Sequence, residues 1–171
     1  MTKKQDITEQ RTLAVLADNE PGVMARIIGL FSGRGYNIDS LTVSEVIHEK
    51  HLSRFTIVTT GSPMVIEQIR SQLERLVPVH GVTDLTVDGN PISRELALVK
   101  VVSKGDKRVE SLRLAEAFRA QVVDASTEHF IFEITGRVSK IDQFITLMEP
   151  LGLAEVARTG IAAIERGPEA M

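Results

Sequence analysis

The residues best suited to chemistry lie where a predicted strand gives way to a predicted helix, at Asp18-Asn19-Glu20-Pro21-Gly22-Val23. Backbone amides at the start of a helix point outward and carry the positive end of the helix dipole, so they suit a carboxylate. Gly22 has no Cβ, which lets a ligand come close to that backbone. The side-chain amide of Asn19 can accept a hydrogen bond from an ammonium group and can also donate one.

A second amide, Asn37, opens the next predicted strand, close to the far end of the same helix. Val23, Met24 and Ile38 supply apolar walls for an aliphatic side chain. A carboxylate site, an ammonium acceptor and an aliphatic pocket together describe an α-amino acid such as valine. From the residues alone a simpler interpretation stays open, because asparagine and glycine are also ordinary residues of turns and of loop-to-strand junctions.

Other chemistry is poorly represented. The chain has no Cys, which excludes disulfides, thiol nucleophiles and thiolate zinc sites. A serine nucleophile elbow, an HExxH motif, an EF-hand loop and a GxxxxGK[ST] motif are all absent from the sequence. The pair His48 and His51 falls in a polar stretch that is more typical of a solvated hairpin loop than of a metal site. The sequence therefore predicts a binding or regulatory protein with no catalytic and no metal-ligating residues.

Composition narrows the class of partner. The 171 residues carry 20 Lys and Arg against 23 Asp and Glu, a net charge of −3. Nucleic-acid-binding modules usually carry a basic excess, and membrane-surface proteins a basic cluster, so neither partner is expected. No run approaches the roughly 20 apolar residues that span a bilayer, and the polar start is unlike a secretory signal. A cytoplasmic protein is the expectation.

Hydrophobic periodicity predicts the order strand, helix, strand, strand, helix, strand, written twice. In the first half we expect strands at 11–17, 37–47, 55–60 and 83–88, and helices at 23–34 and from Pro63, with Ser62 as its N-cap. In the last of these strands Leu85 and Val87 are expected to face inward and Asp84 outward. In the second half we expect helices at 108–119 and around 141–148, and strands starting near Arg94, at 121–125, at 129–135 and within 156–164.

This pattern predicts an α+β protein of two ferredoxin-like βαββαβ domains, with a boundary at Gly89-Asn90-Pro91 that separates residues 1–88 from 89–171. Both helices of each unit would cover one sheet face. The other face needs cover from the sister domain or a second chain, which predicts an oligomer. A single eight-stranded mixed sheet is the alternative, and residues 167–171 are expected to form a frayed tail.

Several runs give the chain a family resemblance. NEPGVMARIIGLFSGRGYNIDSLTVSEV, from Asn19 to Val46, resembles the start of the small subunit of acetolactate synthase (acetohydroxyacid synthase). LSRFTIVTTG from Leu52, the run around 94–101, FRAQVVDAS at 118–126 and VARTGIAAIERG at 156–167 continue the match. The resemblance covers nearly the whole chain from Arg11.

The resemblance implies a regulatory subunit that activates a catalytic large subunit and confers feedback inhibition by valine in branched-chain amino acid biosynthesis. Thiamine diphosphate, Mg²⁺ and FAD would belong to the catalytic subunit, which joins two pyruvates into 2-acetolactate, and this chain would bind no cofactor. Its N-terminal unit would be an ACT domain that forms a homodimer and binds the effector at the interface. A free-standing ACT-type sensor acting on another partner is the alternative.

The same resemblance implies which individual residues of this chain would bind the effector. Asn19 and Gly22 match the family's effector loop, and Val23 and Met24 complete the helix start. Asn37 and Ile38 match positions that the neighbouring subunit contributes. Ala25 stands where some members have Ser.

Overall fold

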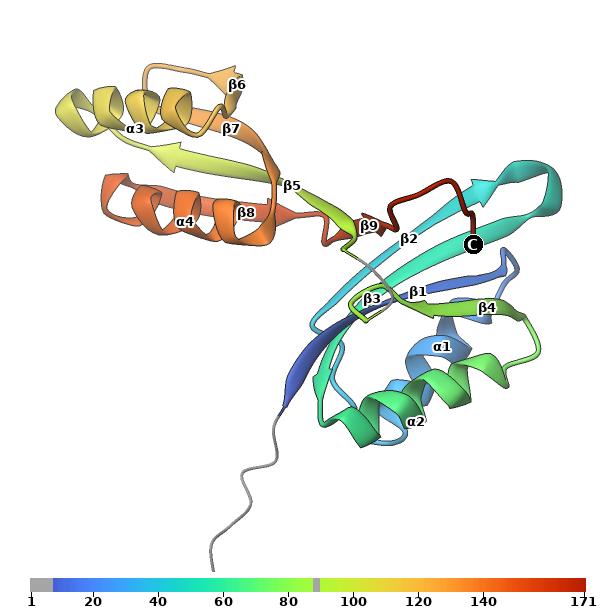
Figure 1. The fold of residues 1–171 in the computed structure, drawn as a ribbon. Helices are drawn as coiled ribbons and strands as arrows, with labels where there is room; N and C mark the ends of the chain where they lie inside the picture. Colours follow the sequence, from blue (N-terminus) through green and yellow to red (C-terminus); the bar gives the residue numbers. More distant parts are fainter. Residues whose placement is uncertain (1–7, 88–89) are drawn as a thin grey trace, which may run out of the picture. The chain divides into compact units, whose positions relative to one another are not determined.

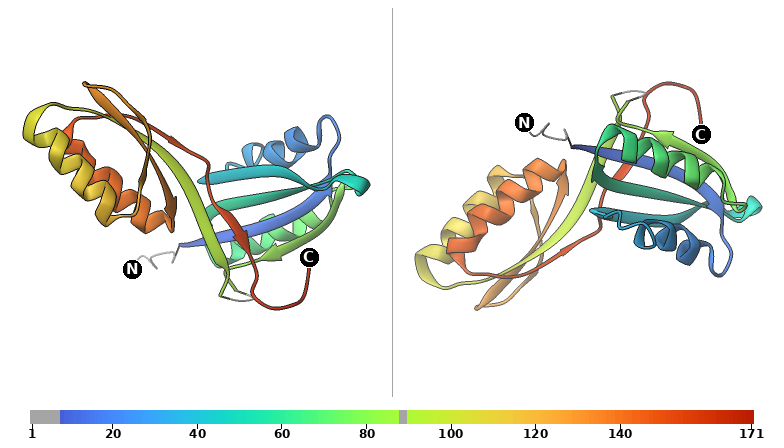
Figure 2. Two further views of the ribbon diagram at one scale, coloured as in Figure 1. Left: turned by 90° about the horizontal axis from the view of Figure 1, so that it is seen from above. Right: turned by 90° about the horizontal axis from the view of Figure 1, so that it is seen from below.

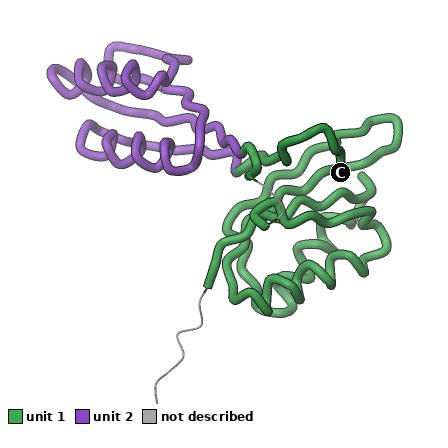
Figure 3. Tube along the Cα trace, viewed as in Figure 1, with its two compact units in different colours: residues 1–92, 161–171 green, residues 93–160 purple. Residues whose placement is uncertain are grey.

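The computed structural model describes residues 8–87 and 90–171. The chain forms two compact units (Figure 3). The first runs to Ile92 and also takes in Ile161–Met171, and the second comprises Ser93–Gly160. The domain boundary expected between residues 88 and 89 lies outside the described residues. The sequence pattern did not indicate that the end of the chain would return to the first unit.

The first unit has the predicted order of elements (Figure 1). These are β1 (Glu9–Asp18), α1 (Val23–Ser32), β2 (Ser40–Ile47), β3 (Leu52–Gly61), α2 (Pro63–Glu74) and β4 (Val79–Asp84), with a 3-10 turn at His48–Lys50 between β2 and β3. The strands form one antiparallel sheet in the order β2-β3-β1-β4. Both helices lie on the same side of this sheet (Figure 2).

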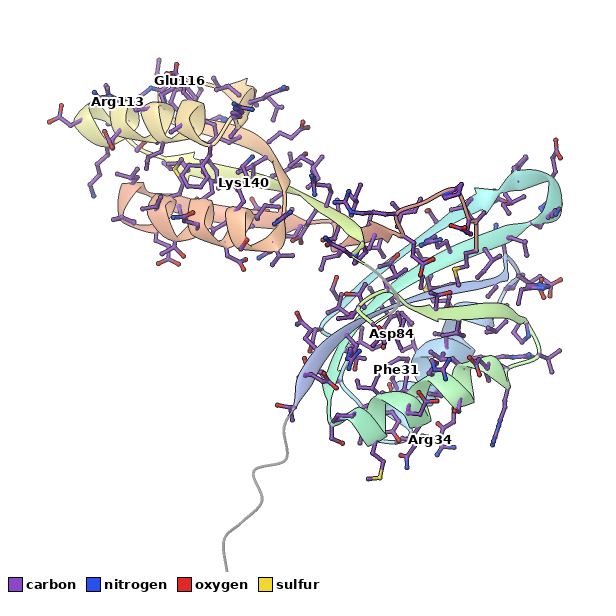
Figure 4. The ribbon with its side chains drawn as sticks, in the orientation of Figure 1. Phe31, Arg34, Asp84, Arg113, Glu116 and Lys140 are labelled. Carbon is purple, nitrogen blue, oxygen red and sulfur yellow. The ribbon has the colours of Figure 1, made fainter. Side chains whose placement is uncertain are left out.

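The core of this unit follows from alternation along β1. Leu13 and Val15 point to the helical side and are fully buried. Ile27 and Phe31 of α1 pack against them, one helical turn apart on the same face; Phe31 lies between α1 and the sheet (Figure 4). At the start of α2 the hydroxyl of Ser62 accepts from the Val65 N–H, which confirms the predicted N-cap.

The last strand of the first unit was predicted too late in the sequence. β4 is Val79–Asp84, and Leu85 to Val87 form a turn. Asp84 is buried, not exposed, because its carboxylate caps this turn through the Thr86 N–H at 2.9 Å and also pairs with Arg11 at 3.4 Å. Leu85 is buried as predicted, but Val87 is 61% exposed.

The sheet face opposite the helices is covered in part by the end of the same chain. Ala14, Thr56 and Val58 on this face are at most 4% exposed. Ala163 packs against Ala14 and Leu85, and its carbonyl accepts from Arg54 Nη2 at 2.9 Å. Met171, which was expected to lie in a frayed tail, places its sulfur 3.6 Å from Arg54 Nη1. The cover expected from a second domain or a second chain therefore comes in part from residues 161–171, and the oligomer stays a prediction.

The second unit repeats the plan. It contains β5 (Ile92–Val102), α3 (Gly105–Ala117), β6 (Gln121–Ala125), β7 (His129–Gly136), α4 (Val138–Met148) and β8 (Leu153–Arg158) in the sheet order β6-β7-β5-β8. A further short strand, β9 (Ala162–Ile164), belongs to the first unit, so the last predicted strand is in fact two. Phe132 and Phe144 meet edge to face in the core, with ring centroids 6.1 Å apart. The two separate sheets confirm the double βαββαβ fold and exclude the single mixed sheet.

The covering segment should matter for stability. Ala163→Asp would bury a charge against Ala14 and Leu85, so we expect the free energy of unfolding of the first unit to fall by about 2 kcal/mol or more. The matched control is Ala162→Asp, because its neighbour Ala162 is exposed and should tolerate the same change within about 0.5 kcal/mol. Urea denaturation followed by circular dichroism measures both. Equal effects of the two variants would contradict the packing described here.

Candidate functional site

The loop between β1 and α1 is held by the two neighbouring strand ends. The Asn19 N–H donates to the carbonyl of His51 at 2.7 Å, and the Asp18 N–H donates to that of Pro78 at 2.9 Å. The Asp18 carboxylate also lies 2.6 Å from Nε2 of His80 on β4. The position of Asn19 is thus fixed by backbone contacts on both sides, while its side chain stays exposed.

The helix that follows begins without a side-chain cap. Gly22 occupies the N-cap position with a φ of +88°, and the first turn carries no acidic residue. A Cβ built at Gly22 would meet nothing within 4 Å. The first amides of a helix have no intrahelical acceptor, so the start of α1 offers N–H donors to a ligand, although the Val23 N–H already donates to the Glu20 carbonyl at 3.3 Å. Such a surface can receive a carboxylate.

The two apolar residues at the start of α1 differ in exposure. Val23 is 5% exposed and belongs to the core, whereas Met24 is 46% exposed. Of these two residues, Met24 is therefore the one that offers an exposed apolar side chain at the start of α1. Ile38 is partly buried and packs on the same core from the other end of the helix.

Asn37 lies beyond the carboxyl end of α1. Its carbonyl accepts from the buried Thr59 hydroxyl, and its side-chain Nδ2 donates to Asp39 Oδ1, both at 2.6 Å. Asp39 in turn accepts from the Thr60 hydroxyl at 2.6 Å. That hydrogen bond, supported by those of Asn37 and Gln10, lowers the pKa of Asp39.

One chain does not bring the two predicted amides together. Asn19 precedes α1 and Asn37 follows it, and a helix of 10 residues is about 15 Å long. A single amino acid cannot bridge that distance. The residues Asn19, Gly22, Val23 and Met24 share one end of α1, and Asn37 and Ile38 share the other.

A cluster that sequence reasoning missed surrounds Asn19. Glu45 on β2 is close enough to the Asn19 side chain for that amide to lower its pKa, and its two oxygens lie 3.0 Å from His48 Nδ1 and 3.6 Å from His51 Nδ1. Hydrogen bonding lowers the pKa of Glu45, with His48 as the largest cause and Asn19 as the next. No local sequence pattern predicts this cluster, because the β2–β3 hairpin contacts the loop before α1 only in the folded chain. The predicted exposure of His48 and His51 is confirmed, at 86% and 73% of their side chains.

Comparisons with known proteins cover most of the chain. The family described as AHAS small subunit-like ACT domain matches residues 13–81, and the family described as small subunit of acetolactate synthase matches residues 94–167. The acetolactate synthase small subunit of Aquifex aeolicus is 46% identical over 155 residues, which cover 90% of this chain and 80% of that protein. The chain belongs to the acetolactate synthase small subunit family.

Further members of the family agree in sequence and in structure. The acetolactate synthase isozyme 3 small subunit of Escherichia coli is 41% identical over 163 residues, 95% of this chain and 99% of that one. The crystal structure of the acetolactate synthase small subunit from Thermotoga maritima has a TM-score of 0.85 at 41% identity, covering 94% of this chain and 99% of that chain. The family resemblance and its ferredoxin-like fold are confirmed.

Within residues 8–87 and 90–171, His, Asp and Glu side chains form no group of three that could hold a metal ion. The described helices include none that is both long and apolar enough to cross a membrane.

The pair formed by His48 and Glu45 generates a pH prediction. The hydrogen bond and charge of Glu45 raise the pKa of His48 above its ordinary value of 6.5. A raised pKa means that the pair contributes stability at pH values below 6.5 and loses that contribution as the pH rises through the folded-state pKa. We expect an NMR titration to place the His48 pKa above 6.5, and Glu45→Gln to bring it back toward 6.5. The same value in both proteins would show that the pair does not form.

Proposed function

We propose that this chain is the regulatory subunit of acetolactate synthase: it binds the catalytic large subunit, raises its activity and makes it subject to inhibition by valine. The observation that carries the proposal is the likeness over at least 90% of the chain to relatives named as small subunits of that enzyme. By the family resemblance, thiamine diphosphate, Mg²⁺ and FAD are held by the catalytic subunit, and this chain works beside it in the cytoplasm.

The effector enters at the uncapped end of α1. Its carboxylate meets the backbone amides that follow Gly22, its ammonium group meets the Asn19 amide, and its aliphatic side chain lies near Met24. These groups match the three parts of a branched amino acid. The open space beside Gly22 and the missing side-chain cap support this placement.

The site is completed by a second copy of the chain. Because α1 separates Asn19 from Asn37 by about 15 Å, the Asn37 that reaches the effector belongs to another chain. The ACT domain that dimerises and binds the effector lies in the first unit, and Ser93–Gly160 form the second small-subunit domain. Valine joins the two ACT domains and favours a dimer geometry that withdraws activation from the catalytic subunit.

Inhibition of this kind requires valine to bind two states of the holoenzyme unequally. The usual coupling of about 1–3 kcal/mol corresponds to an effect of up to about a hundredfold. In this proposal the coupling comes from contacts that valine makes only in the bridged dimer.

Reconstitution tests the proposal. The chain is mixed with an acetolactate synthase catalytic subunit, and formation of 2-acetolactate from pyruvate is followed with and without L-valine. We expect a higher rate with the chain present and a valine-dependent fall of that rate. If the catalytic subunit neither binds the chain nor changes its rate, the chain acts instead as a sensor for another partner, and the proposal is wrong.

Gly22 gives a charge-specific prediction. Gly22→Asp would place a carboxylate where the effector's own carboxylate binds, so we expect the reconstituted enzyme to lose its valine response while assembly survives. Gly22→Asn is the matched control, because Asn has the same shape and tolerates the left-handed backbone similarly but carries no charge. Its valine response should be weakened less. Unchanged inhibition of the Gly22→Asp enzyme would contradict this site.

Asn37 gives a second prediction, at the other end of the helix. Asn37→His is bulkier and loses the amide oxygen, so we expect valine inhibition to need at least about tenfold more valine. Isothermal titration of the parent and the variant measures the change directly. Equal affinities would show that Asn37 does not contact the effector.

A further inference from the structure

Both proposed effector amides lie beside a carboxylate of their own chain. Asn37 Nδ2 donates to Asp39 Oδ1 at 2.6 Å, and the Asn19 side chain is close enough to Glu45 to lower the pKa of that carboxyl. The two asparagines belong to different segments and the two carboxylates to different positions around β2, so the arrangement occurs twice independently. Neither Asp39 nor Glu45 is itself a proposed contact of the effector.

A carboxylate fixes which way an amide points. An ionised Asp or Glu side chain only accepts hydrogen bonds, so the part of an asparagine that faces it must be the NH₂ group. The amide oxygen then lies on the opposite side, away from the carboxylate. At both Asn19 and Asn37 the amide oxygen is therefore left for a ligand, beside the second N–H of the NH₂ group, and an oxygen acceptor is what an ammonium ion needs.

The two carboxylates are themselves held in place and ionised. Asp39 accepts from Thr60 and Gln10 in addition to Asn37, and these bonds lower its pKa. Glu45 faces His48 and His51, whose ring nitrogens lie at its two oxygens, and its pKa is lowered as well. Near neutral pH both side chains are thus acceptors only, and the orientation of the amides persists.

We propose that Asp39 and Glu45 are positioning residues that set the effector site to recognise an ammonium group, and so to distinguish an amino acid from a carboxylic acid of the same shape that lacks the amine. The inference rests on the proposed function, because it assumes that Asn19 and Asn37 meet the effector. It adds the residues that determine what chemistry those amides recognise.

The test compares two ligands that differ only at the amine, L-valine and 3-methylbutanoate, by isothermal titration of the full-length chain. We expect the unaltered chain to prefer valine by about a hundredfold or more, since the analogue leaves both amide oxygens without a donor. Asp39→Asn and Glu45→Gln keep the shape but can donate, which allows the asparagine to turn its NH₂ toward the ligand. Each should weaken valine binding about tenfold and leave 3-methylbutanoate binding unchanged within about twofold.

Glu67→Gln is the matched control, because Glu67 is an exposed carboxylate on α2 that pairs with Arg70; it should change neither affinity. A thermal melt by circular dichroism confirms that each variant is folded. Equal weakening of both ligands would reduce Asp39 and Glu45 to a structural role and overturn the inference, as would unchanged valine affinity in both variants. If the unaltered chain bound no valine at all, the effector assignment itself would fall, and this inference with it.

Discussion

At Gly22 the backbone turns with a φ of +88°, and α1 starts with no side chain closing its first turn. This conformation is costly for most residues and open to glycine, so the helix start is free where a side chain would otherwise lie. The same helix buries Ile27 and Phe31 against β1, which fixes its direction. A well-packed helix thus presents an unfilled amino end, and the proposed regulation depends on that end.

Hydrogen bonds to the neighbouring strand ends hold the exposed loop before α1. Its backbone is bonded to the carbonyls of His51 and Pro78, and the two side chains before the turn meet His80 and Glu45. A loop held from both sides loses little entropy when it binds a ligand. The length of α1 then imposes the second requirement: since the other amide lies beyond its far end, a compact ligand can meet both only through two chains.

The sequence was sufficient to predict the strands and helices around the site, but not the contacts between segments that are far apart in the chain. The strand of Leu13 and Val15, the helix of Ile27 and Phe31, and the cap at Ser62 were predictable because their signals are local. The error at Asp84 arose because alternation cannot show that a carboxylate is buried to cap a turn. The return of Ala163 to the first sheet, and the contact of Glu45 with Asn19, join residues far apart in sequence. The contact of Asn37 with Asp39 spans only two residues, and their spacing is the signal that could have revealed it.

A crystal structure of the chain grown with L-valine tests the central claim most directly. The account predicts valine at the amino end of α1, with its carboxylate on the amides after Gly22. Its ammonium nitrogen should lie about 3 Å from the Asn19 oxygen and from the Asn37 oxygen of a second chain. Valine bound at another place, or an empty loop at a valine concentration that saturates inhibition, would contradict it.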